Sequence, residues 1–300
     1  MPELPEVETI RLGLEKYLVG CKIIDVEIKI PKMLAGSAKQ IIGAKIIGLK
    51  RIGKGLIIEL DNDFVLAIHL KMTGQLVYSD SKTKGLTLSP KVGGPTLPSK
   101  YTHVIFKLKT PAAAKALASK QNSYLYYNDL RQFGWVKVVR KDELMQIPFF
   151  KEMGPEPPVA KAMGGQAPLN LSKFIEILGK SNTAIKVLIM DQKKIGGIGN
   201  IYANDALFKA KIDPRRSAKQ ITPEEAKRLY EATIYVLKKS LEYGGSSDEN
   251  FVNALGQEGN YQKHALVYGR EGEKCPDCNS RVQKIKLGGR GTYFCPKCQK

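Results

Sequence analysis

The chain has 300 residues, with 48 Lys and Arg against 29 Asp and Glu, a net charge of +19 and a pI near 9.6. This length allows two or three domains with well-buried cores, and the basic excess favours a polyanionic partner such as nucleic acid. No apolar run approaches the roughly 18 residues of a membrane span, and the acidic, proline-containing start is not typical of a signal peptide. We therefore expect a cytoplasmic protein with no membrane segment.

The chain begins Met-Pro-Glu-Leu-Pro-Glu, and removal of Met1 would leave Pro2 as a secondary amine beside the Glu3 carboxylate. An α-amino group has a pKa near ~7.7 to 8.0, so part of it is an unprotonated nucleophile at neutral pH. Its attack on an acetal or aldehydic carbon gives an iminium, and Glu3 can move protons at that centre. The structural interpretation is that Pro5 is the first residue of a helix whose dipole Glu3 and Glu6 favour. We expect both interpretations to hold.

The following residues predict one helix and then a series of short strands. Apolar residues recur at helical spacing from Val7 to Leu18, and Gly20 ends the pattern. Residues 24–30 alternate, which predicts a strand with its isoleucines and valine on one face. Further strands are expected over 45–51, 56–60, 64–70, 75–78, 104–108, 124–127 and 135–139. Close-set strands without alternating helices indicate an antiparallel sandwich or flattened barrel.

Three segments between these strands have distinct compositions. Residues 79–100 contain many Ser, Lys, Gly and Pro residues and predict a long exposed loop, whose lysines could contact phosphates but which is more typical of a solvated insertion. Residues 111–119 are Ala-rich and predict a short helix. The turn 128–134 holds Arg131 and Phe133, a pair that could stack on a base and contact a phosphate.

The composition and the apolar periodicity of the sequence change after about residue 140. Residues 154–158 read Gly-Pro-Glu-Pro-Pro, which excludes helix and central strand, and beyond residue 166 the apolar periodicity is helical. Thr-Pro-Glu-Glu at 222–225 predicts the capped start of a long helix that ends at Gly244. We therefore predict an N-terminal domain over 1–140, a linker over 141–166, a helical domain over 167–262 and a final segment over 263–300.

A glycine-rich turn at 196–199 precedes a helix that Asn200 would cap. Bare backbone N–H groups at such a helix start can bind an anion, and the Asn200 amide could donate to a phosphate as well. The structural alternative is a tight turn that needs glycine for positive φ. A nucleotide-binding loop is less favoured, because no strand precedes these glycines and no Lys-Ser or Lys-Thr pair follows them.

The C-terminus carries the most specific isolated motif, a pair of C-x-x-C sequences separated by 16 residues. They consist of Cys275, Cys278, Cys295 and Cys298. This spacing favours one structural Zn²⁺ held by four thiolates over two disulfides or a redox pair. A basic hairpin with Lys284, Lys286 and Arg290 lies between the two motifs, and Cys21 is most simply a small buried hydrophobe.

Together these motifs resemble formamidopyrimidine-DNA glycosylase, a bacterial base-excision repair enzyme, over nearly the whole chain. The matching stretches are residues 1–9, 69–74, 129–134, 154–157, 197–203, 267–270 and the zinc ribbon. The resemblance implies an α+β multidomain fold, with an N-terminal helix and antiparallel β-sandwich, a helix-two-turn-helix domain and a four-cysteine zinc finger built on a β-hairpin. It also implies a monomer that is associated with the nucleoid.

The resemblance implies an enzyme that excises oxidised purines, chiefly 8-oxoguanine and formamidopyrimidines, from double-stranded DNA and cleaves the abasic site by β,δ-elimination. By the family's pattern, Pro2 attacks the sugar C1′ and Glu3 is the acid and base. Lys54 then assists β-elimination, and Arg290 assists δ-elimination. Because the lesion must leave the stack, the resemblance also implies DNA-contacting residues. These are Met72, Arg131 and Phe133, which fill the void, and Tyr101, Ser181 and Asn200, which contact phosphates.

The chain departs from the family's pattern at several positions and leaves two alternatives open. Lys71 replaces the usual Gly, Leu130 and Gln132 replace Pro and Arg, and Tyr101 replaces His. One alternative is an endonuclease VIII-like glycosylase for oxidised pyrimidines, although that relative lacks the void-filling residues. The other is a non-catalytic protein that binds damaged DNA, although the amine, its neighbouring carboxylate and both elimination residues are present.

Overall fold

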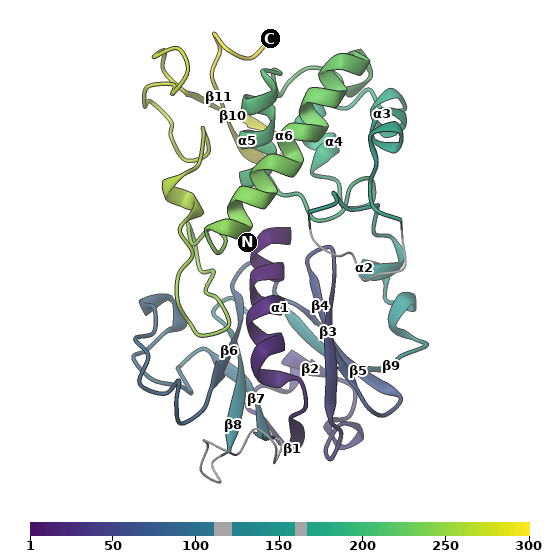
Figure 1. Cartoon of the computed structure of the whole chain (residues 1–300), viewed down its shortest axis with the longest axis vertical. Helices are drawn as coiled ribbons and strands as arrows, with labels where there is room; N and C mark the ends of the chain where they lie inside the picture. Colours follow the sequence, from purple (N-terminus) through teal and green to yellow (C-terminus); the bar gives the residue numbers. More distant parts are fainter. Residues whose placement is uncertain (111–121, 160–166) are drawn as a thin grey trace. The chain divides into compact units, whose positions relative to one another are not determined.

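The computed structural model describes residues 1–110, 122–159 and 167–300, so the helix predicted over 111–119 lies outside the described residues. The chain forms two compact units (Figure 1). The first comprises Met1–Lys151 and Tyr243–Asn260, and the second comprises Glu152–Glu242 and Tyr261–Lys300. Residues 243–260, which the sequence pattern groups with the helical domain, thus cluster with the N-terminal unit.

The first unit contains the N-terminal helix and two β-sheets. Its helices are α1 (Leu4–Leu18) and α2 (Pro148–Lys151), and its strands are β1 (Lys22–Ile28), β2 (Leu34–Ala35), β3 (Ile46–Ile52), β4 (Gly55–Leu60), β5 (Phe64–His69), β6 (Gly74–Ser79), β7 (Thr102–Lys109), β8 (Ser123–Asp129) and β9 (Trp135–Arg140). One sheet has the order β1-β7-β8-β6 and the other β2-β9-β5-β4-β3. All pairs are antiparallel except β2 with β9.

Both sheets contribute side chains to one apolar core. Phe106 of the first sheet, Leu56 and Ile68 of the second, and Leu14 of α1 belong to the same buried cluster. Burial of large apolar side chains from two sheets and a helix is the main force that holds such layers together. The structure therefore confirms the predicted antiparallel sandwich with an N-terminal helix.

The predicted alternation holds along most of the first strand, because Val26 and Ile30 pack against the core while Asp25, Glu27 and Lys29 are exposed. The burial is uneven, since Ile28 is 38% exposed whereas Ile23, just before the alternating residues, is fully buried. An irregularity between Ile23 and Asp25 in the pairing of β1 with β7 separates Ile23 from that alternation.

Much of the loop 79–100 is exposed, as its composition predicts, but part of it is buried. A short 3-10 helix, Pro90–Val92, buries Val92 completely against Val77 and Val252. A loop of this length is held in place only when part of it contributes to a core, and here it closes a small apolar cluster of its own.

The second unit is helical and ends in a β-hairpin. Its elements are α3 (Leu171–Gly179), α4 (Ile185–Ile189), α5 (Asn200–Ala210), α6 (Pro223–Glu242), β10 (Gln283–Leu287) and β11 (Arg290–Phe294). The predicted capping box of α6 is present, because Glu225 N–H donates to Thr222 Oγ1 at 3.3 Å and Thr222 N–H donates to Glu225 Oε2 at 2.9 Å. Among the described residues, none of the helices combines the length and apolar character that crossing a bilayer requires.

Candidate functional site

The N-terminal residues are organised by the start of α1. Glu3 is the N-cap, is only 2% exposed, and forms a reciprocal capping box with Glu6. Its backbone N–H donates to Glu6 Oε2 at 2.8 Å, and Glu6 Oε1 accepts the Ser246 N–H at 2.8 Å. Because Glu3 takes the cap position, Pro5 is the second helical residue, and the expectation that it is the first was wrong. The helix therefore fixes the backbone direction of the residues that precede it, including the buried Pro2.

A buried ion-pair network ties α1 to the β3–β4 turn. Arg51 Nε donates to Glu8 Oε2 at 3.0 Å, and Arg51 Nη1 donates to the Gly53 carbonyl oxygen at 2.9 Å. The Arg51 and Glu8 side chains are 1% and 4% exposed. Removing one member of such a pair leaves a buried charge and typically costs about 3–5 kcal/mol of stability. Lys54, the next residue in the turn and itself only 4% exposed, is therefore held by a rigid backbone.

Strand register brings three turns to one edge of the sandwich. In the five-stranded sheet, Gly55 pairs with His69 and His69 pairs with Trp135. In the four-stranded sheet, Gly74 pairs with Asp129. The turn with Lys54, the turn 70–73 and the turn 130–134 all continue from these paired ends, so they lie at the same edge.

Thr73 and Asp129 brace the last two of these turns against each other. Thr73 Oγ1 donates to Asp129 Oδ1 at 2.5 Å and accepts the Arg131 N–H at 2.9 Å. The second carboxylate oxygen of Asp129 accepts the Gly134 N–H at 2.8 Å, and Asp129 is fully buried. The structure thus brings the segment with Met72 together with the segment that carries Arg131.

The tip of the 130–134 turn presents a supported aromatic ring. Phe133 is 57% exposed, and the Arg131 guanidinium lies 4.8 Å from its ring centre. A cation against an aromatic face steadies a ring that solvent would otherwise surround. Lys71 and Gln132, two of the departures from the family's pattern, both adopt left-handed backbone, with φ of 52° and 57°. This conformation favours glycine, which accounts for the family's usual Gly at position 71.

Tyr101 lies beside the hydrogen-bonded pair of Thr73 and Asp129. Its carbonyl oxygen accepts the Asp129 N–H at 2.9 Å, and its half-buried ring packs against Gly93, where a side chain would collide with it. Gly93 adopts φ of +96°, so both space and backbone conformation require glycine there. The Lys100 ammonium lies 5.1 Å from the Tyr101 ring centre and adds positive charge at this position.

His69 is a site residue to which the sequence analysis assigned no role. It is 5% exposed, its Nδ1 accepts the Lys71 N–H at 2.8 Å, and its ring contacts Phe149 edge-on at 4.4 Å. Burial, followed by the charges of Lys71 and Lys54, lowers the pKa of His69 to about 3. The ring is therefore neutral at physiological pH and orients the turn before Met72. The only sequence signal was a polar residue at the end of an otherwise apolar strand.

In the second unit, a buried lysine supports the hairpin that carries Arg290. Lys186 is fully buried, and its ammonium donates to the Gly291 carbonyl oxygen at 2.8 Å and to Thr292 Oγ1 at 2.7 Å. Gly288, in the turn, lies so close to Val187 that a Cβ would approach it to 2.7 Å. Arg290 itself is exposed just after this turn, where it is available to an anion.

Asn204 links that hairpin to the start of α5. Its Oδ1 accepts the Tyr293 N–H at 2.7 Å, and its Nδ2 donates to the Asn200 carbonyl oxygen at 2.6 Å. Asn200 is the first residue of α5 rather than its cap, which is Gly199, so the predicted capping role was wrong. The backbone of Gly199 takes that extended position, and the half-buried Asn200 lies in the first turn instead. Ser181 follows α3 in a separate turn, where its carbonyl oxygen accepts the Lys219 N–H at 2.9 Å.

The four C-terminal cysteines form a closed metal site. Their sulfur atoms all lie within 4.8 Å of one another, with Cys275 and Cys298 3.8 Å apart and Cys278 and Cys295 3.5 Å apart. Zn–S bonds of about 2.3 Å in a tetrahedron place sulfurs about 3.8 Å apart, so the geometry fits one Zn²⁺. Four thiolates leave no open position for a water, and the zinc is structural. Cys21 is separate and buried, and burial raises the pKa of its thiol to about 11.

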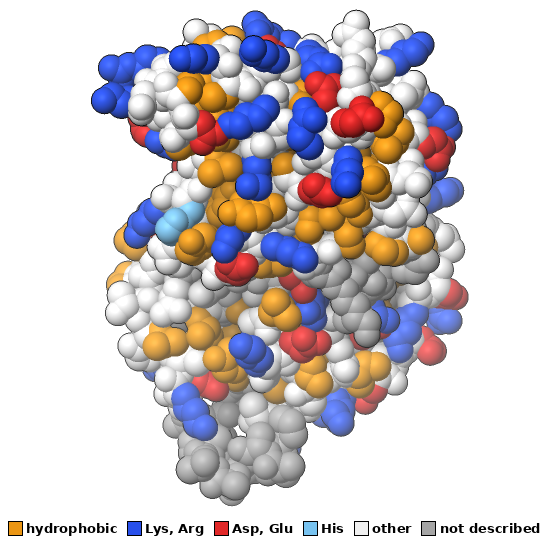
Figure 2. All heavy atoms as spheres, turned by 45° about the horizontal axis from the view of Figure 1, so that its top comes forward, with side chains coloured by type: hydrophobic (Ala, Val, Ile, Leu, Met, Phe, Trp, Pro, Cys, Tyr) orange, Lys and Arg blue, Asp and Glu red, His pale blue; other side chains and the backbone are white. Residues whose placement is uncertain are grey.

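Positive charge is widespread on the surface. Figure 2 shows Lys and Arg side chains scattered over the face in view and fewer Asp and Glu side chains among them. Residues 261–300, which contain the zinc site, hold nine Lys and Arg against three Asp and Glu. This excess matches a polyanionic ligand rather than an acidic or neutral one.

The fold and site define a class: a β-sandwich protein with a capped N-terminal helix, a helical unit and a zinc hairpin. Three family models match the chain, namely the formamidopyrimidine-DNA glycosylase N-terminal domain over 1–136, its H2TH domain over 153–251 and the zinc finger found in FPG and IleRS over 272–300. The chain belongs to the formamidopyrimidine-DNA glycosylase family.

Individual relatives match along the full length. The formamidopyrimidine-DNA glycosylases of Pelotomaculum thermopropionicum and Streptococcus mutans are 39% and 36% identical, with 100% of this chain and at least 99% of each relative covered. A Lactococcus lactis protein in complex with Fapy-dG-containing DNA is 35% identical, with a TM-score of 0.81 over 99% of this chain and 100% of that one. The same protein with abasic-site DNA has a TM-score of 0.81 at 35% identity, with 99% of each chain covered.

Proposed function

We propose that this DNA glycosylase excises oxidised purines from duplex DNA through a covalent bond between Pro2 and the sugar, and then cleaves the strand by β,δ-elimination. The observation that carries the proposal is the buried Glu3 carboxylate at the start of α1, directly after Pro2. Membership of the family and its relatives' complexes with damaged DNA support the substrate class. Its expected place of action is the cytoplasm, on the chromosome.

The covalent step requires that Met1 be removed. The Pro2 nitrogen then forms a bond to C1′ as the bond from C1′ to the base breaks, and the base leaves with the electron pair and takes up a proton. Glu3 is the group that can supply and recover protons there, because α1 holds it next to the amine. The amine then loses its proton and the C1′–O4′ bond opens, with O4′ taking up a proton, which gives the iminium. The iminium acidifies the neighbouring C2′ proton, and removal of that proton expels the 3′-phosphate.

Two cationic side chains are proposed to assist elimination. Lys54 comes from the β3–β4 turn, which the Arg51 network ties to α1, and this link to the helix that follows Pro2 supports its proposed role. Arg290 lies on the zinc hairpin, and its guanidinium would hold the phosphate that leaves in the second elimination.

The remaining site residues are proposed to hold the distorted duplex. The exposed Phe133 ring, with Arg131 and Met72, would occupy the space vacated by the flipped nucleotide, and stacking of an aromatic ring on a base contributes about 1–3 kcal/mol. Phosphates would be contacted from both units. The proposed contacts are Tyr101, Ser181 and Asn200.

Borohydride trapping tests the proposal. Wild-type protein mixed with an 8-oxoguanine duplex should become covalently attached to the DNA, and peptide mapping should place the link on Pro2. A variant with residues added before Pro2 converts the amine into an amide, so it should form no adduct. An adduct formed equally well by this variant would identify a lysine such as Lys54 as the nucleophile and overturn the proposal.

Glu3→Gln separates proton transfer from binding. Loss of a general acid–base group typically lowers a rate by about 10²–10⁴-fold, so base excision should fall at least about 100-fold while DNA affinity changes little. Cleavage of a preformed abasic site should be less affected. Glu27→Gln, at an exposed position on β1, is the matched control and should leave both rates unchanged. Equal loss in both variants would exclude a specific role for Glu3.

A second candidate substrate is an oxidised pyrimidine. The Lactococcus lactis protein, with a TM-score of 0.81 at 35% identity and both chains fully covered, has also been solved with DNA that contains one. Competition between 8-oxoguanine and oxidised-pyrimidine duplexes at equal concentration would decide which lesion this chain prefers.

A further inference from the structure

The insertion 79–100 is bonded to the segment 243–260, which in turn contacts the start of α1. Both segments belong to the first unit, although 142 residues separate them in the sequence. Neither composition nor family resemblance assigned the insertion a function. Its contacts nevertheless lead toward the residue proposed as the acid and base.

Three side chains make the link, and we call them the clamp: Ser89, Lys91 and Glu258. Ser89 Oγ donates to Glu258 Oε1 at 2.6 Å, and the Lys91 ammonium lies 2.9 Å from Glu258 Oε2. Lys91 also donates to the Ser247 carbonyl oxygen. The backbone adds a bond of 2.8 Å from Ser89 N–H to the Gly256 carbonyl oxygen. Each carboxylate oxygen of Glu258 therefore has a donor from the insertion.

A helix cap and apolar contacts between the same two segments fix the geometry of the clamp. Ser89 caps the 3-10 helix Pro90–Val92, because its Oγ accepts the Lys91 N–H at 3.2 Å. The buried Val92 packs with Val252, and Leu88 packs against Gly256, whose φ of +75° lets the chain turn beneath it. An isolated surface ion pair contributes little, but here Lys91 and Glu258 are each next to a buried residue, Val92 and Gly259.

The segment 243–260 also contacts the start of α1, where Glu3 and Glu6 lie. Ser247 Oγ donates to the Phe251 carbonyl oxygen at 2.8 Å and accepts the Gly259 N–H at 2.9 Å, which holds the segment in a closed loop. The adjacent Ser246 N–H donates to Glu6 Oε1, while Glu6 Oε2 accepts the N–H of Glu3. The Glu6 carboxylate thus joins the clamped loop directly to the proposed acid and base.

We infer that Ser89, Lys91 and Glu258 are positioning residues that hold the 243–260 segment against Glu6 and so orient Glu3 for base excision. The inference rests on the proposed function of Glu3. None of the three is a catalytic residue, because their effect reaches the reaction only through Ser246 and Glu6.

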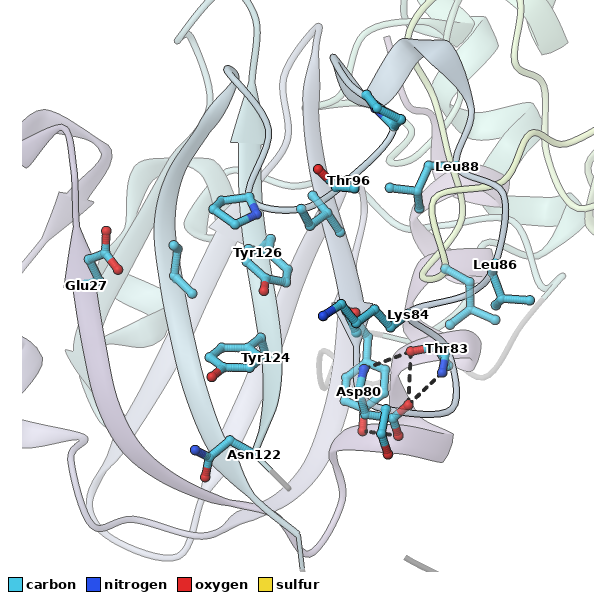
Figure 3. Close-up of a pocket in the computed structure, with 18 residues that line it drawn as sticks. Glu27, Asp80, Thr83, Lys84, Leu86, Leu88, Thr96, Asn122, Tyr124 and Tyr126 are labelled. Atoms are coloured by element: carbon cyan, nitrogen blue, oxygen red, sulfur yellow. Dashed lines mark hydrogen bonds between the residues drawn. The ribbon is translucent and has the colours of Figure 1, made fainter. Parts of the chain in front are cut away.

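Another part of the insertion provides a control position. There it covers a pocket of about 720 Å³ lined by Tyr124, Tyr126 and Lys84 (Figure 3). Asp80 shapes this part, because its Oδ1 accepts the backbone N–H groups of Lys82 and Thr83 at 2.9 and 2.8 Å. Figure 3 shows Lys84 among the pocket residues, so Lys84→Met changes the same residue type in the same insertion without touching the clamp.

The test compares Lys91→Met with Lys84→Met on two substrates, an 8-oxoguanine duplex and a duplex with a preformed abasic site. Loss of a charged hydrogen bond predicts that Lys91→Met lowers kcat for base excision about fivefold. KM and the rate of abasic-site cleavage should change less than about twofold, because neither depends strongly on Glu3. Lys84→Met should match wild type on both substrates.

A charge exchange completes the test. Lys91→Glu and Glu258→Lys should each lower excision, and the double variant should recover most of the loss, since the pair is restored with its charges reversed. Equal excision by Lys91→Met and wild type would overturn the inference, and so would a parallel loss on both substrates with a lower Tm. Failure of the wild type to form a borohydride adduct would instead overturn the proposed function, and the inference with it.

Discussion

The two units hold their functional residues by different means. In the first, Glu3, Lys54 and Phe133 stand at a helix start and at strand ends, and strand register and buried hydrogen bonds set their places. In the second, Arg290 stands on a two-stranded hairpin between two pairs of cysteines. A hairpin of this size is only marginally stable by itself. The proposed covalent chemistry therefore rests on an apolar core, whereas the proposed phosphate contact of Arg290 rests on a hairpin held between metal-binding cysteines.

The buried cations of the two units show the same contrast. Arg51 joins two parts of a sandwich core, with Glu8 as its counter-ion. Lys186 is equally buried, and its ammonium donates to the Gly291 carbonyl oxygen and to Thr292 Oγ1 on the zinc hairpin. A buried ammonium that loses its hydrogen-bond acceptors is costly. Loss of the hairpin should therefore also destabilise α4, the helix that carries Lys186.

Removal of zinc should have the largest effect and should affect the second unit alone. Cys275→Ser leaves three thiolates, and because metal binding supplies much of the folding free energy of such sites, DNA binding should be abolished. Trp135, the only tryptophan of the chain, lies in the first unit, so its fluorescence should remain native. Affinity is measured by fluorescence anisotropy of labelled DNA and metal content by elemental analysis.

Cys21→Ala is the matched control for that experiment. Cys21 lies outside the metal site, and its substitution should leave zinc content and DNA affinity at wild-type values. Undiminished DNA binding by a zinc-free Cys275→Ser protein would show that the hairpin does not depend on the metal.

A smaller effect is expected from the phosphate contacts themselves. Arg290→Ala should weaken binding about tenfold on damaged and undamaged duplex alike, and it should reduce the slope of log affinity against log salt by about one. Asn200→Ala should weaken both complexes without that change in slope, because it removes no charge. Salt titrations of each variant measure both quantities.

Arg281→Ala serves as the control in the same zinc-bearing segment, because its guanidinium already donates to the Gly272 carbonyl oxygen at 2.7 Å. It should leave the salt slope near that of wild type. If Arg290→Ala weakened binding to damaged DNA alone, the result would show that Arg290 recognises the lesion rather than a phosphate.

The smallest effect concerns His69 and sharpens the description of the first unit. Its pKa of about 3 in the fold lies below its ordinary value of 6.5, so the unfolded chain binds its proton first as pH falls. Stability from the neutral ring is therefore complete above about pH 6.5 and is lost progressively toward pH 3. Between about pH 7.5 and 5.5 the free energy of unfolding should fall by about 1.4 kcal/mol more in wild type than in His69→Asn.

Asparagine is chosen because its amide oxygen can accept the Lys71 N–H in place of Nδ1 but does not titrate. Urea unfolding followed by Trp135 fluorescence at each pH gives the two free-energy curves. His264→Asn, at an exposed position in the second unit, should follow the wild-type curve. Parallel curves for wild type and His69→Asn would show that His69 does not remain neutral in the fold.

Local patterns predicted those parts of the fold that depend on local physics. The capped start at Thr222, the short strands and the cysteine pairs all follow from preferences within a few residues, and the structure confirms them. The expectation that Asn200 caps α5 was wrong, because the backbone of Gly199 takes the cap position and leaves no signal in side-chain spacing.

The sequence by itself determined the chemistry available to this protein: an amine with a neighbouring carboxylate, four thiolates and a large basic excess. The tertiary structure alone decided which residues support that chemistry. The contacts of Glu8 with Arg51, of Thr73 with Asp129 and of Lys91 with Glu258 join residues 43, 56 and 167 positions apart. Polar side chains at such separations become partners only when folding has removed water and fixed their backbones, so no local pattern could announce them.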